Sequence, residues 1–263
     1  MKKIVFFVMA VVVFSFCSAV VPVAVMADQS VDKRSNIDKL TDPDPTVRRN
    51  AVIYLGAEKN KANIPTLIRM LDDSNIEVKR AAINSLVNMK STRAETRFFA
   101  MLKTEKNVSV KVNLISALGD MQAKTAVQAL EGLLSDPYPL YRSEALKALG
   151  KINDPQTYPG IVNMLKDEAE GVRIMAAQVS AMLKLSEAIP LIAKNTNDGV
   201  GAVRRISAQA LGELGDISVM ADLQKLLTDK DQSVVIAARN AIDHINSKSK
   251  PAEQQPSTTK TSQ

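Results

Sequence analysis

A basic residue recurs at regular intervals along this chain, each time with an acidic residue at a fixed distance before it. The basic positions are Arg48, Lys79, Lys111, Arg142, Arg173 and Arg204. The acidic positions are Asp42, Asp73, Asp136, Asp167, Asp198 and Asp229, and we place Thr104 at the one position without aspartate. A cation beside a carboxylate could serve acid–base chemistry, but a catalytic site needs different residues to converge on one place. Because these pairs are copies of one another, we interpret them as a ladder of ion pairs between neighbouring units of the fold.

The other residue types offer little further chemistry. His244 is the only histidine of the chain, and because no second histidine or nucleophile accompanies it, we expect it to be solvated or to cap the final helix. Cys17 is the only cysteine and lies in an apolar N-terminal segment, so the rest of the chain has no thiol ligand. No glycine-rich phosphate loop follows a strand. The sequence therefore predicts no catalytic residue, no cofactor and no metal site, and we expect that the protein is not an enzyme.

The elements that carry the ladder recur with a period of about 31 residues. This period is marked by Leu40, Leu71, Leu102, Leu134, Leu165 and Leu227, with Thr196 in the one place where leucine is missing. Self-similarity of this length is typical of a solenoid, in which each unit buries its apolar face only against its neighbours.

The sequence of each repeat predicts two antiparallel helices. In the first repeat, Asp44 is suited to the N-cap and Pro45 to the first helical position, where its missing N–H costs nothing. Apolar residues then recur on one helical face at Val47, Ala51, Tyr54 and Leu55. We expect Gly56 to end this helix by adopting positive φ, and a second apolar face follows from Ile64 to Leu71. Seven such units predict an all-α, right-handed α-solenoid of about seven helical hairpins.

The repeat pattern resembles HEAT repeats, and in particular the short HEAT-like units first associated with phycobilin lyases. The resemblance covers roughly residues 31–246 and implies that the first helix of each pair lines the concave face of the solenoid. HEAT-like repeats serve as adaptors, lyase subunits and scaffolds alike. One relative of this fold, deoxyhypusine hydroxylase, carries paired His-Glu motifs for two irons, and none occurs in this sequence. We therefore do not expect that activity.

The two ends of the chain lie outside the repeats. Residues 1–27 begin with Lys2 and Lys3, continue as an apolar run and end in small residues, which is typical of a signal peptide cleaved after Ala27. The alternative is an uncleaved membrane anchor. Because Phe16 precedes Cys17, we do not expect a lipoprotein. We assign residues 28–246 to the solenoid and residues 247–263 to a disordered polar tail.

A signal peptide predicts a periplasmic or secreted protein, or one anchored at its N-terminus if the leader stays attached. The net charge is +6, and +4 without the leader, which is mild for a nucleic-acid-binding protein, and we expect no nucleic acid partner. Export would also separate the protein from the cytoplasmic substrates of phycobilin lyases, so we do not expect that activity either.

The solvent-facing side of the first helices is the candidate binding surface. Fourteen positions should face away from the core, because they lie two and six residues after the apolar position that recurs in all seven repeats: Val47, Val78, Val110, Tyr141, Val172, Val203 and Val234. No acidic residue occurs among them, and four are basic: Arg49, Arg80, Lys147 and Arg205. Gln178 and Gln209 lie on the same face. We expect this surface to bind another protein through an acidic or amphipathic segment.

A group of tyrosines is a second candidate surface. Tyr138 lies at a helix start, where an exposed ring would anchor an interface, whereas we expect Tyr141 to lie in the core.

Two functional interpretations follow. The first is an exported, non-enzymatic scaffold or adaptor that works as a monomer and binds a partner protein on its concave face. The alternative is an accessory or chaperone-like subunit of an enzyme complex, such as a lyase-like helper.

Overall fold

The computed structural model describes residues 34–249, and the repeats form one compact unit that starts at Asn36. The predicted signal peptide at residues 1–27 and most of the predicted tail lie outside the described residues. Every regular element in residues 34–249 is a helix. None of these helices combines the length and the apolar character that crossing a membrane would require.

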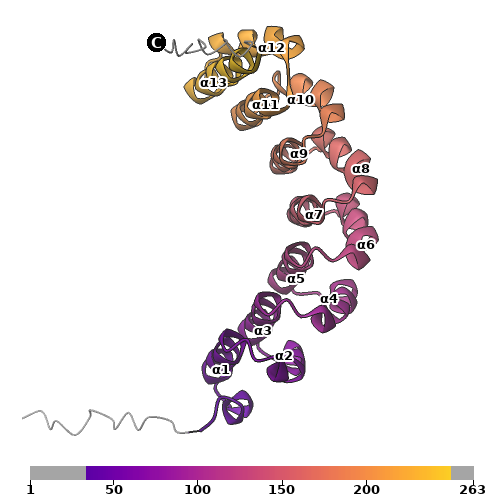
Figure 1. Ribbon diagram of the computed structural model, residues 1–263, viewed down its shortest axis with the longest axis vertical. Helices are drawn as coiled ribbons and strands as arrows, with labels where there is room; N and C mark the ends of the chain where they lie inside the picture. The colour runs from indigo at the N-terminus through magenta and orange to yellow at the C-terminus, as the bar shows by residue number, and fades with distance from the viewer. Residues whose placement is uncertain (1–33, 250–263) are drawn as a thin grey trace, which may run out of the picture. The chain divides into compact units, whose positions relative to one another are not determined.

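Seven long helices form one layer of the solenoid and shorter helices form the other (Figure 1). The long helices are α1 (Pro45–Ala57), α3 (Ile76–Asn88), α5 (Val108–Asp120), α7 (Pro139–Ile152), α9 (Glu170–Met182), α11 (Gly201–Leu214) and α13 (Gln232–Ser249). The second layer contains α2 (Ile64–Arg69), α4 (Thr92–Thr104), α6 (Val127–Gly132), α8 (Tyr158–Asn163), α10 (Ile189–Asn195) and α12 (Met220–Lys225). The solenoid curves so that the long helices line its concave side, as expected.

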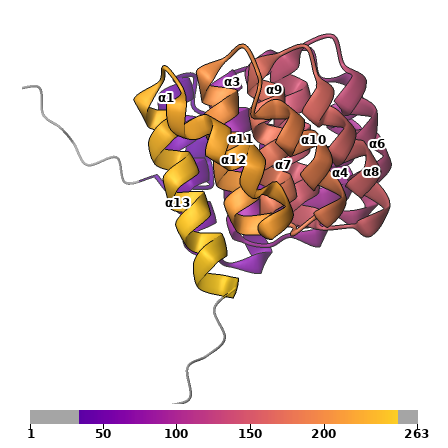
Figure 2. The ribbon, with the colours of Figure 1, turned by 90° about the horizontal axis from the view of Figure 1, so that it is seen from above.

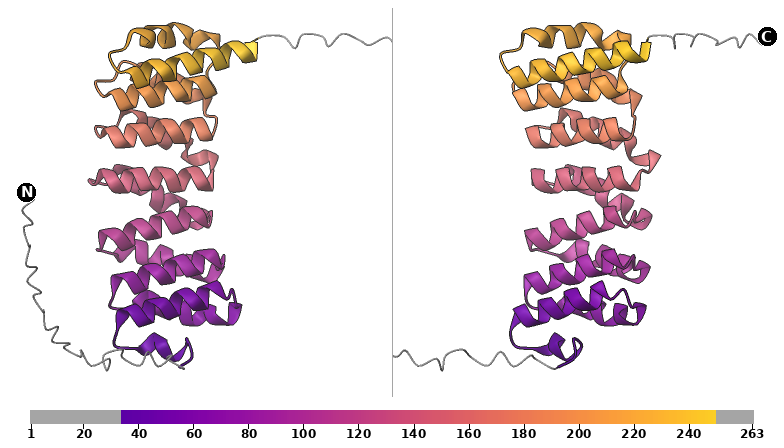
Figure 3. Two further views of the ribbon diagram at one scale, coloured as in Figure 1. Left: turned by 90° about the vertical axis from the view of Figure 1, so that its left-hand side faces the viewer. Right: turned by 60° about the vertical axis from the view of Figure 1, so that its left-hand side comes forward.

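Short 3-10 segments flank most helices of the outer layer. They are η1 (Asp38–Thr41), η2 (Lys61–Asn63), η3 (Met70–Asp72), η4 (Lys124–Ala126), η5 (Leu133–Ser135), η6 (Pro155–Thr157), η7 (Met164–Lys166), η8 (Ser186–Ala188), η9 (Ile217–Val219) and η10 (Leu226–Thr228). The long helices stack one above another like rungs (Figure 3), and the view from above shows both layers (Figure 2). The predicted all-α solenoid is therefore confirmed. Its seventh repeat contributes α13, which continues to Ser249, three residues beyond the predicted end of the repeats.

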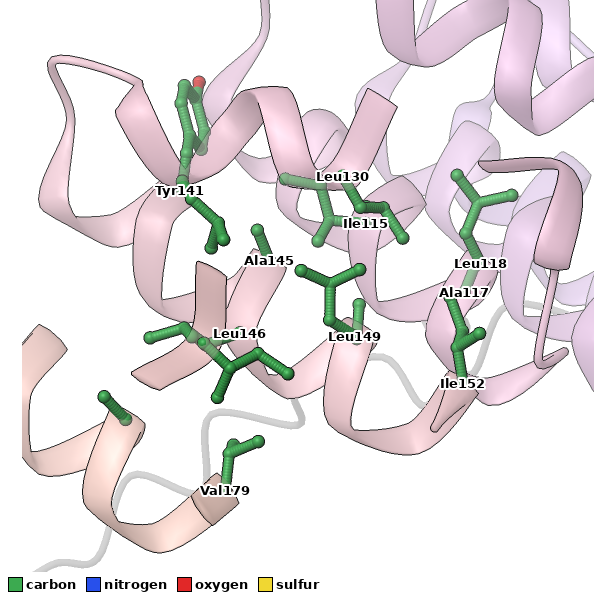
Figure 4. Close-up of a cluster of buried hydrophobic side chains, with 14 of the residues drawn as sticks. Ile115, Ala117, Leu118, Leu130, Tyr141, Ala145, Leu146, Leu149, Ile152 and Val179 are labelled. Carbon is green, nitrogen blue, oxygen red and sulfur yellow. The ribbon is translucent and has the colours of Figure 1, made fainter. Parts of the chain in front are cut away.

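The core lies between the two layers and between successive long helices (Figure 4). Ile115 and Leu118 of α5 pack with Leu130 of α6 and with Leu146 and Leu149 of α7, and all five side chains are fully buried. The polar substitutions in the repeat pattern are also buried: Thr196 takes the place of a leucine, and its hydroxyl donates to the Ala193 carbonyl at 2.7 Å.

The predicted start of the first helix is confirmed, whereas the prediction for its end is wrong. The Asp44 carboxylate accepts a hydrogen bond from the Thr46 amide at 2.7 Å, with Pro45 in the first turn. Gly56, however, lies inside α1, and no described glycine has positive φ. The left-handed residue of this repeat is Lys59, with φ of 53°.

Gly56 is instead required for close packing between helices. A Cβ atom at this position would meet the Ser85 side chain of α3 at 2.4 Å, which is shorter than any normal contact. Gly119 of α5 and Gly212 of α11 stand at the equivalent position of their repeats, and we call these three residues the glycine column. An added Cβ atom would lie 2.6 Å from the Cα atom of Ala148 at Gly119, and 2.8 Å from that of Ala241 at Gly212. These glycines therefore let each long helix approach the next one closely.

Candidate functional site

The predicted ladder of ion pairs is confirmed and runs along one edge of the long helices. Arg142 donates from Nε and Nη2 to the two carboxylate oxygens of Asp167, at 2.8 Å and 2.7 Å. Its Nη1 donates to the Asp136 carbonyl at 2.8 Å. Each arginine therefore joins the turn before its own helix to the first turn of the next repeat. The same arrangement joins Arg48 to Asp73, Arg173 to Asp198 and Arg204 to Asp229.

Burial makes these pairs structural rather than catalytic. The side chains of Arg142 and Asp167 are each 7% exposed, and every strong donor and acceptor of the pair is occupied. The hydrogen bonds from Arg48 lower the pKa of the Asp73 carboxyl, and the Asn75 amide adds to this effect. A carboxylate in this environment stays charged at neutral pH. The ion pair as a whole therefore leaves no donor or acceptor available to bind a substrate.

The assignment of the acidic position in the third repeat is wrong. Glu105, rather than Thr104, fills it, because its Oε1 accepts from the Asn107 amide at 2.8 Å. This is the contact that Asp42 makes with the Asp44 amide at the same distance. The third repeat has one extra residue between Leu102 and the next conserved apolar position, so counting from the leucine gives the wrong register.

The two lysines of the ladder do not form the arginine arrangement. Lys111 lies 4.0 Å from Asp136 and its Nζ lies over the Tyr141 ring, 4.5 Å from the centroid. Within the described part of the chain, no ion pair joins Lys79 to Glu105. A lysine ammonium is a compact charge on a flexible stem and lacks the planar fork with which a guanidinium binds both oxygens of a carboxylate while a further N–H reaches a backbone carbonyl.

The fourteen predicted binding-surface positions are all accessible on the concave side. None is buried, and those that are exposed include Ile53, Lys147, Gln178, Gln209 and Ile236. Val112 and Ser143 in the middle are half-buried. The predicted orientation of these residues is therefore confirmed, and that they bind a partner stays a prediction.

The charge of this surface differs from the sequence-based expectation. Glu77 pairs with Arg80 at 3.0 Å and Glu144 pairs with Lys147 at 2.7 Å, in both cases from the preceding turn of the same helix. Arg49 and Arg205 form no ion pair with any described residue. Counting only two positions per repeat missed these acids, although their spacing of three residues from a cation is a recognised signal for helix pairs.

Grooves lie between successive long helices on this surface. The groove between α1 and α3 has a volume of ≈ 380 Å³ and is lined by Arg49, Ile53, Glu77, Arg80, Asn84 and Asn88, among others. Between α9 and α11 a groove of ≈ 430 Å³ is lined by Gln178, Met182, Ile206, Gln209 and Glu213, among others. A third, of ≈ 530 Å³, lies between α11 and α13 and includes Glu213 and His244.

Tyr138 and Tyr141 have the environments that the sequence indicates. Tyr138 is 63% exposed at the start of α7, whereas Tyr141 is 5% exposed, with ring centroids 5.6 Å apart. Burial raises the pKa of the Tyr141 hydroxyl. Tyr138 is thus available at the edge of the solenoid, and its role as an interface anchor stays a prediction.

Comparison with known proteins shows that the chain belongs to the HEAT-repeat family. The family of HEAT repeats matches residues 34–106, 95–181, 130–205 and 158–243. Among solved structures, one chain in the complex of CpcE and CpcF of phycocyanin lyase from Nostoc sp. PCC7120 shares the fold. It is 21% identical, with 80% of this chain and 93% of that chain covered and a TM-score of 0.51.

Two curated relatives illustrate the range of the family. Deoxyhypusine hydroxylase of Candida albicans is 31% identical over 36% of this chain and 30% of its own length. Phycocyanobilin lyase subunit alpha of Nostoc sp. is 27% identical over 60% of this chain and 60% of its own length. The chain thus spans between about a third and three fifths of these relatives.

The expectation that the protein is not an enzyme is contradicted by these relatives. They are hydroxylases and lyase subunits, and further fungal deoxyhypusine hydroxylases match at similar identity. The expectation relied on a lack of catalytic motifs. In a repeat protein, however, a catalytic contribution can be made by a few side chains on a shared scaffold or by the complex as a whole.

Proposed function

We propose that this chain is a subunit of an enzyme complex and that it binds its partner subunit on the concave face. The observation that carries the proposal is the accessible surface formed by two residues from each of the seven long helices. The family relationship supports it, because one relative is a lyase subunit and the structural neighbour belongs to a complex of two different chains.

A lyase-type subunit fits the residues better than an iron-dependent hydroxylase. The chain has a single histidine, His244, which is exposed on α13. The described residues contain no group of three or more histidine, cysteine or carboxylate side chains placed to hold a metal ion. A donor set of this kind does not fit the two irons of the hydroxylases. The proposal therefore rests on the lyase branch of the relatives.

The chemistry of the concave face indicates the kind of partner segment. Ile53, Ile174 and Ile236 provide apolar contacts along the surface, and Arg49 and Arg205 provide unpaired positive charges. Such a surface suits an amphipathic segment that carries some acidic residues.

Affinity capture from a native extract tests the proposal. The bait is the full chain, and a variant replaces Arg49, Arg80, Lys147 and Arg205 by alanine. A matched control replaces four exposed cations of the outer helices, Arg69, Arg93, Lys194 and Lys225, by alanine. We expect a partner enzyme subunit with the wild type and the control and its loss with the first variant. Equal capture by all three proteins would contradict the concave-face interface.

We also infer from the composition of residues 1–27 that the protein is exported and that its mature form begins at Asp28. In that case its partner subunit is also exported, and the complex acts on a substrate other than the cytoplasmic ones of phycobilin lyases. The intact mass of protein isolated from its native cells tests this inference. A mass lower by the leader supports cleavage after Ala27, and a full-length mass in the membrane fraction supports an anchor instead.

A further inference from the structure

The groove between α1 and α3 differs from the others by its two arginines. Arg49 projects from α1 and Arg80 from the same position of α3, one repeat later. The amides of Asn84 and Asn88 line the same groove, which has a volume of ≈ 380 Å³. One acid, Glu77, is present, and it binds Nη1 of Arg80 at 3.0 Å while its own side chain stays 55% exposed.

Both guanidinium groups have a donor without an acceptor. Nε of Arg49 and Nε of Arg80 are inaccessible to solvent and make no hydrogen bond with any described residue. Arg49 has one weak contact, from Nη2 to the Asn50 side chain at 3.4 Å. A buried donor without an acceptor is unfavourable. A carboxylate in the groove would instead meet the accessible part of each guanidinium, since the Arg80 side chain is 42% exposed, and the guanidinium fork is suited to binding carboxylates.

The opposite end of the concave face provides an internal comparison. The grooves between α9 and α11 and between α11 and α13 have no arginine in their linings, and both are lined by Glu213. The two arginines therefore give the α1–α3 groove more positive charge than the grooves beside α11, which Glu213 lines and Arg205 does not. Charge complementarity then favours an acidic group of the partner at the α1–α3 end.

We propose that the groove between α1 and α3 binds a carboxylate of an acidic segment of the partner protein. Arg49 and Arg80 hold the carboxylate from two sides, and the side-chain amides of Asn84 and Asn88, which line the same groove, supply further donors. This inference rests on the proposed partner-binding function, and it adds the position of the acidic contact and hence the direction of the segment along the concave face.

Binding of a defined peptide tests the proposal directly. The probe is a hexaglutamate peptide, with hexaglutamine as the uncharged reference, titrated into the full chain by calorimetry. We expect hexaglutamate alone to bind, and the double variant Arg49→Gln/Arg80→Gln to bind it at least about tenfold more weakly. The control Arg69→Gln/Arg93→Gln removes the same charge from exposed positions on α2 and α4 and should lose less than about twofold.

A spectroscopic measurement shows whether the groove itself is occupied. The ¹⁵N–¹H signals of the two Nε–H groups, assigned by their loss in Arg49→Lys and Arg80→Lys, should shift on addition of hexaglutamate. Equal weakening in both double variants, or unmoved Nε–H signals at saturation, would overturn the carboxylate site. Circular dichroism confirms that each variant is folded.

The two proposals fail in different ways. If the wild type captures its partner and Arg49→Gln/Arg80→Gln captures it equally well, the carboxylate site is wrong while the subunit function stands. If no partner is captured but hexaglutamate binds in the groove as described, the site stands and the subunit function is wrong.

Discussion

At the scale of single residues, the arginine ladder is the main polar feature of the fold. Each arginine binds a carboxylate of the next repeat and a carbonyl of its own turn, so one side chain holds two repeats in register. Removing one partner of a buried pair leaves an uncompensated charge and is strongly destabilising.

Asp167→Asn should lower the free energy of unfolding by about 3 kcal/mol, because Arg142 then loses its buried counter-charge. Asp136→Asn is the matched control, since Asp136 lies 4.0 Å from Lys111 and accepts the same kind of backbone bond, from the Tyr138 amide. We expect that control to cost less than about 1 kcal/mol. Urea unfolding followed by circular dichroism measures both values, and similar losses would show that the arginine fork contributes no more than the lysine contact.

The ladder also predicts a dependence of stability on pH. The Arg48 and Arg204 hydrogen bonds lower the pKa values of Asp73 and Asp229 below their usual 3.8. The unfolded chain therefore takes up these protons first as the pH falls, so the stabilisation is complete above pH 3.8 and is lost through the lower folded pKa values. Unfolding midpoints measured from pH 6 to pH 2 should fall below about pH 4. Asp73→Asn should flatten this decline, and an unchanged profile would contradict the assignment.

At the scale of elements, helix spacing is controlled by the glycine column. Gly119 lies where a Cβ atom would be 2.6 Å from the Cα atom of Ala148 on the next long helix. A side chain there must push the two helices apart, and overpacking of this kind is destabilising.

Gly119→Ala should therefore lower the free energy of unfolding by about 1–3 kcal/mol, although alanine is the better helix former. Gly132→Ala on α6 is the control, because no atom lies within 4 Å of its new Cβ. That change should raise stability by up to about 1 kcal/mol. Thermal or urea unfolding measures the free energy of unfolding of both variants. Stabilisation by both substitutions would show that α5 and α7 can move apart without a loss of stability.

At the scale of the whole solenoid, the contact between α3 and α5 is less reinforced than its neighbours. Val87 of α3 stands at the position where α1, α5 and α11 have Gly56, Gly119 and Gly212. In addition, Lys79 forms no ion pair with Glu105 in the described structure. Stability in a solenoid is approximately a sum over repeats and their interfaces, so a weak interface separates two cooperative blocks.

Native-state hydrogen exchange should therefore show that α1 and α3 open together, at lower free energy than α7 and α9. The other end of the solenoid controls for fraying, because Arg204 and Gly212 reinforce the contact of α11 with α13. Lys79→Arg with Glu105→Asp supplies the missing ladder contact and should slow exchange in α1 and α3 by about fivefold. Uniform protection from α1 to α9 would contradict a weak interface.

The sequence by itself determined the repeat length, the all-α class and the side of each helix that faces solvent. These features are local, because apolar periodicity decides which face is buried and the Asp44–Pro45 step marks a helix start wherever it stands. The buried partners of the ladder could also be anticipated, since the same residue types recur at the same spacing in consecutive repeats.

Only the tertiary structure decided which residue fills the acidic position of the third repeat and why a glycine is needed at position 56. The extra residue of the third repeat can be placed on either side of Thr104 in a one-dimensional count, and only the contact with the Asn107 amide assigns it. Whether a glycine serves a turn or a close approach depends on the neighbouring helix, which is about 31 residues away. The pairing of Glu77 with Arg80, by contrast, could have been anticipated from their spacing of three residues on one helix.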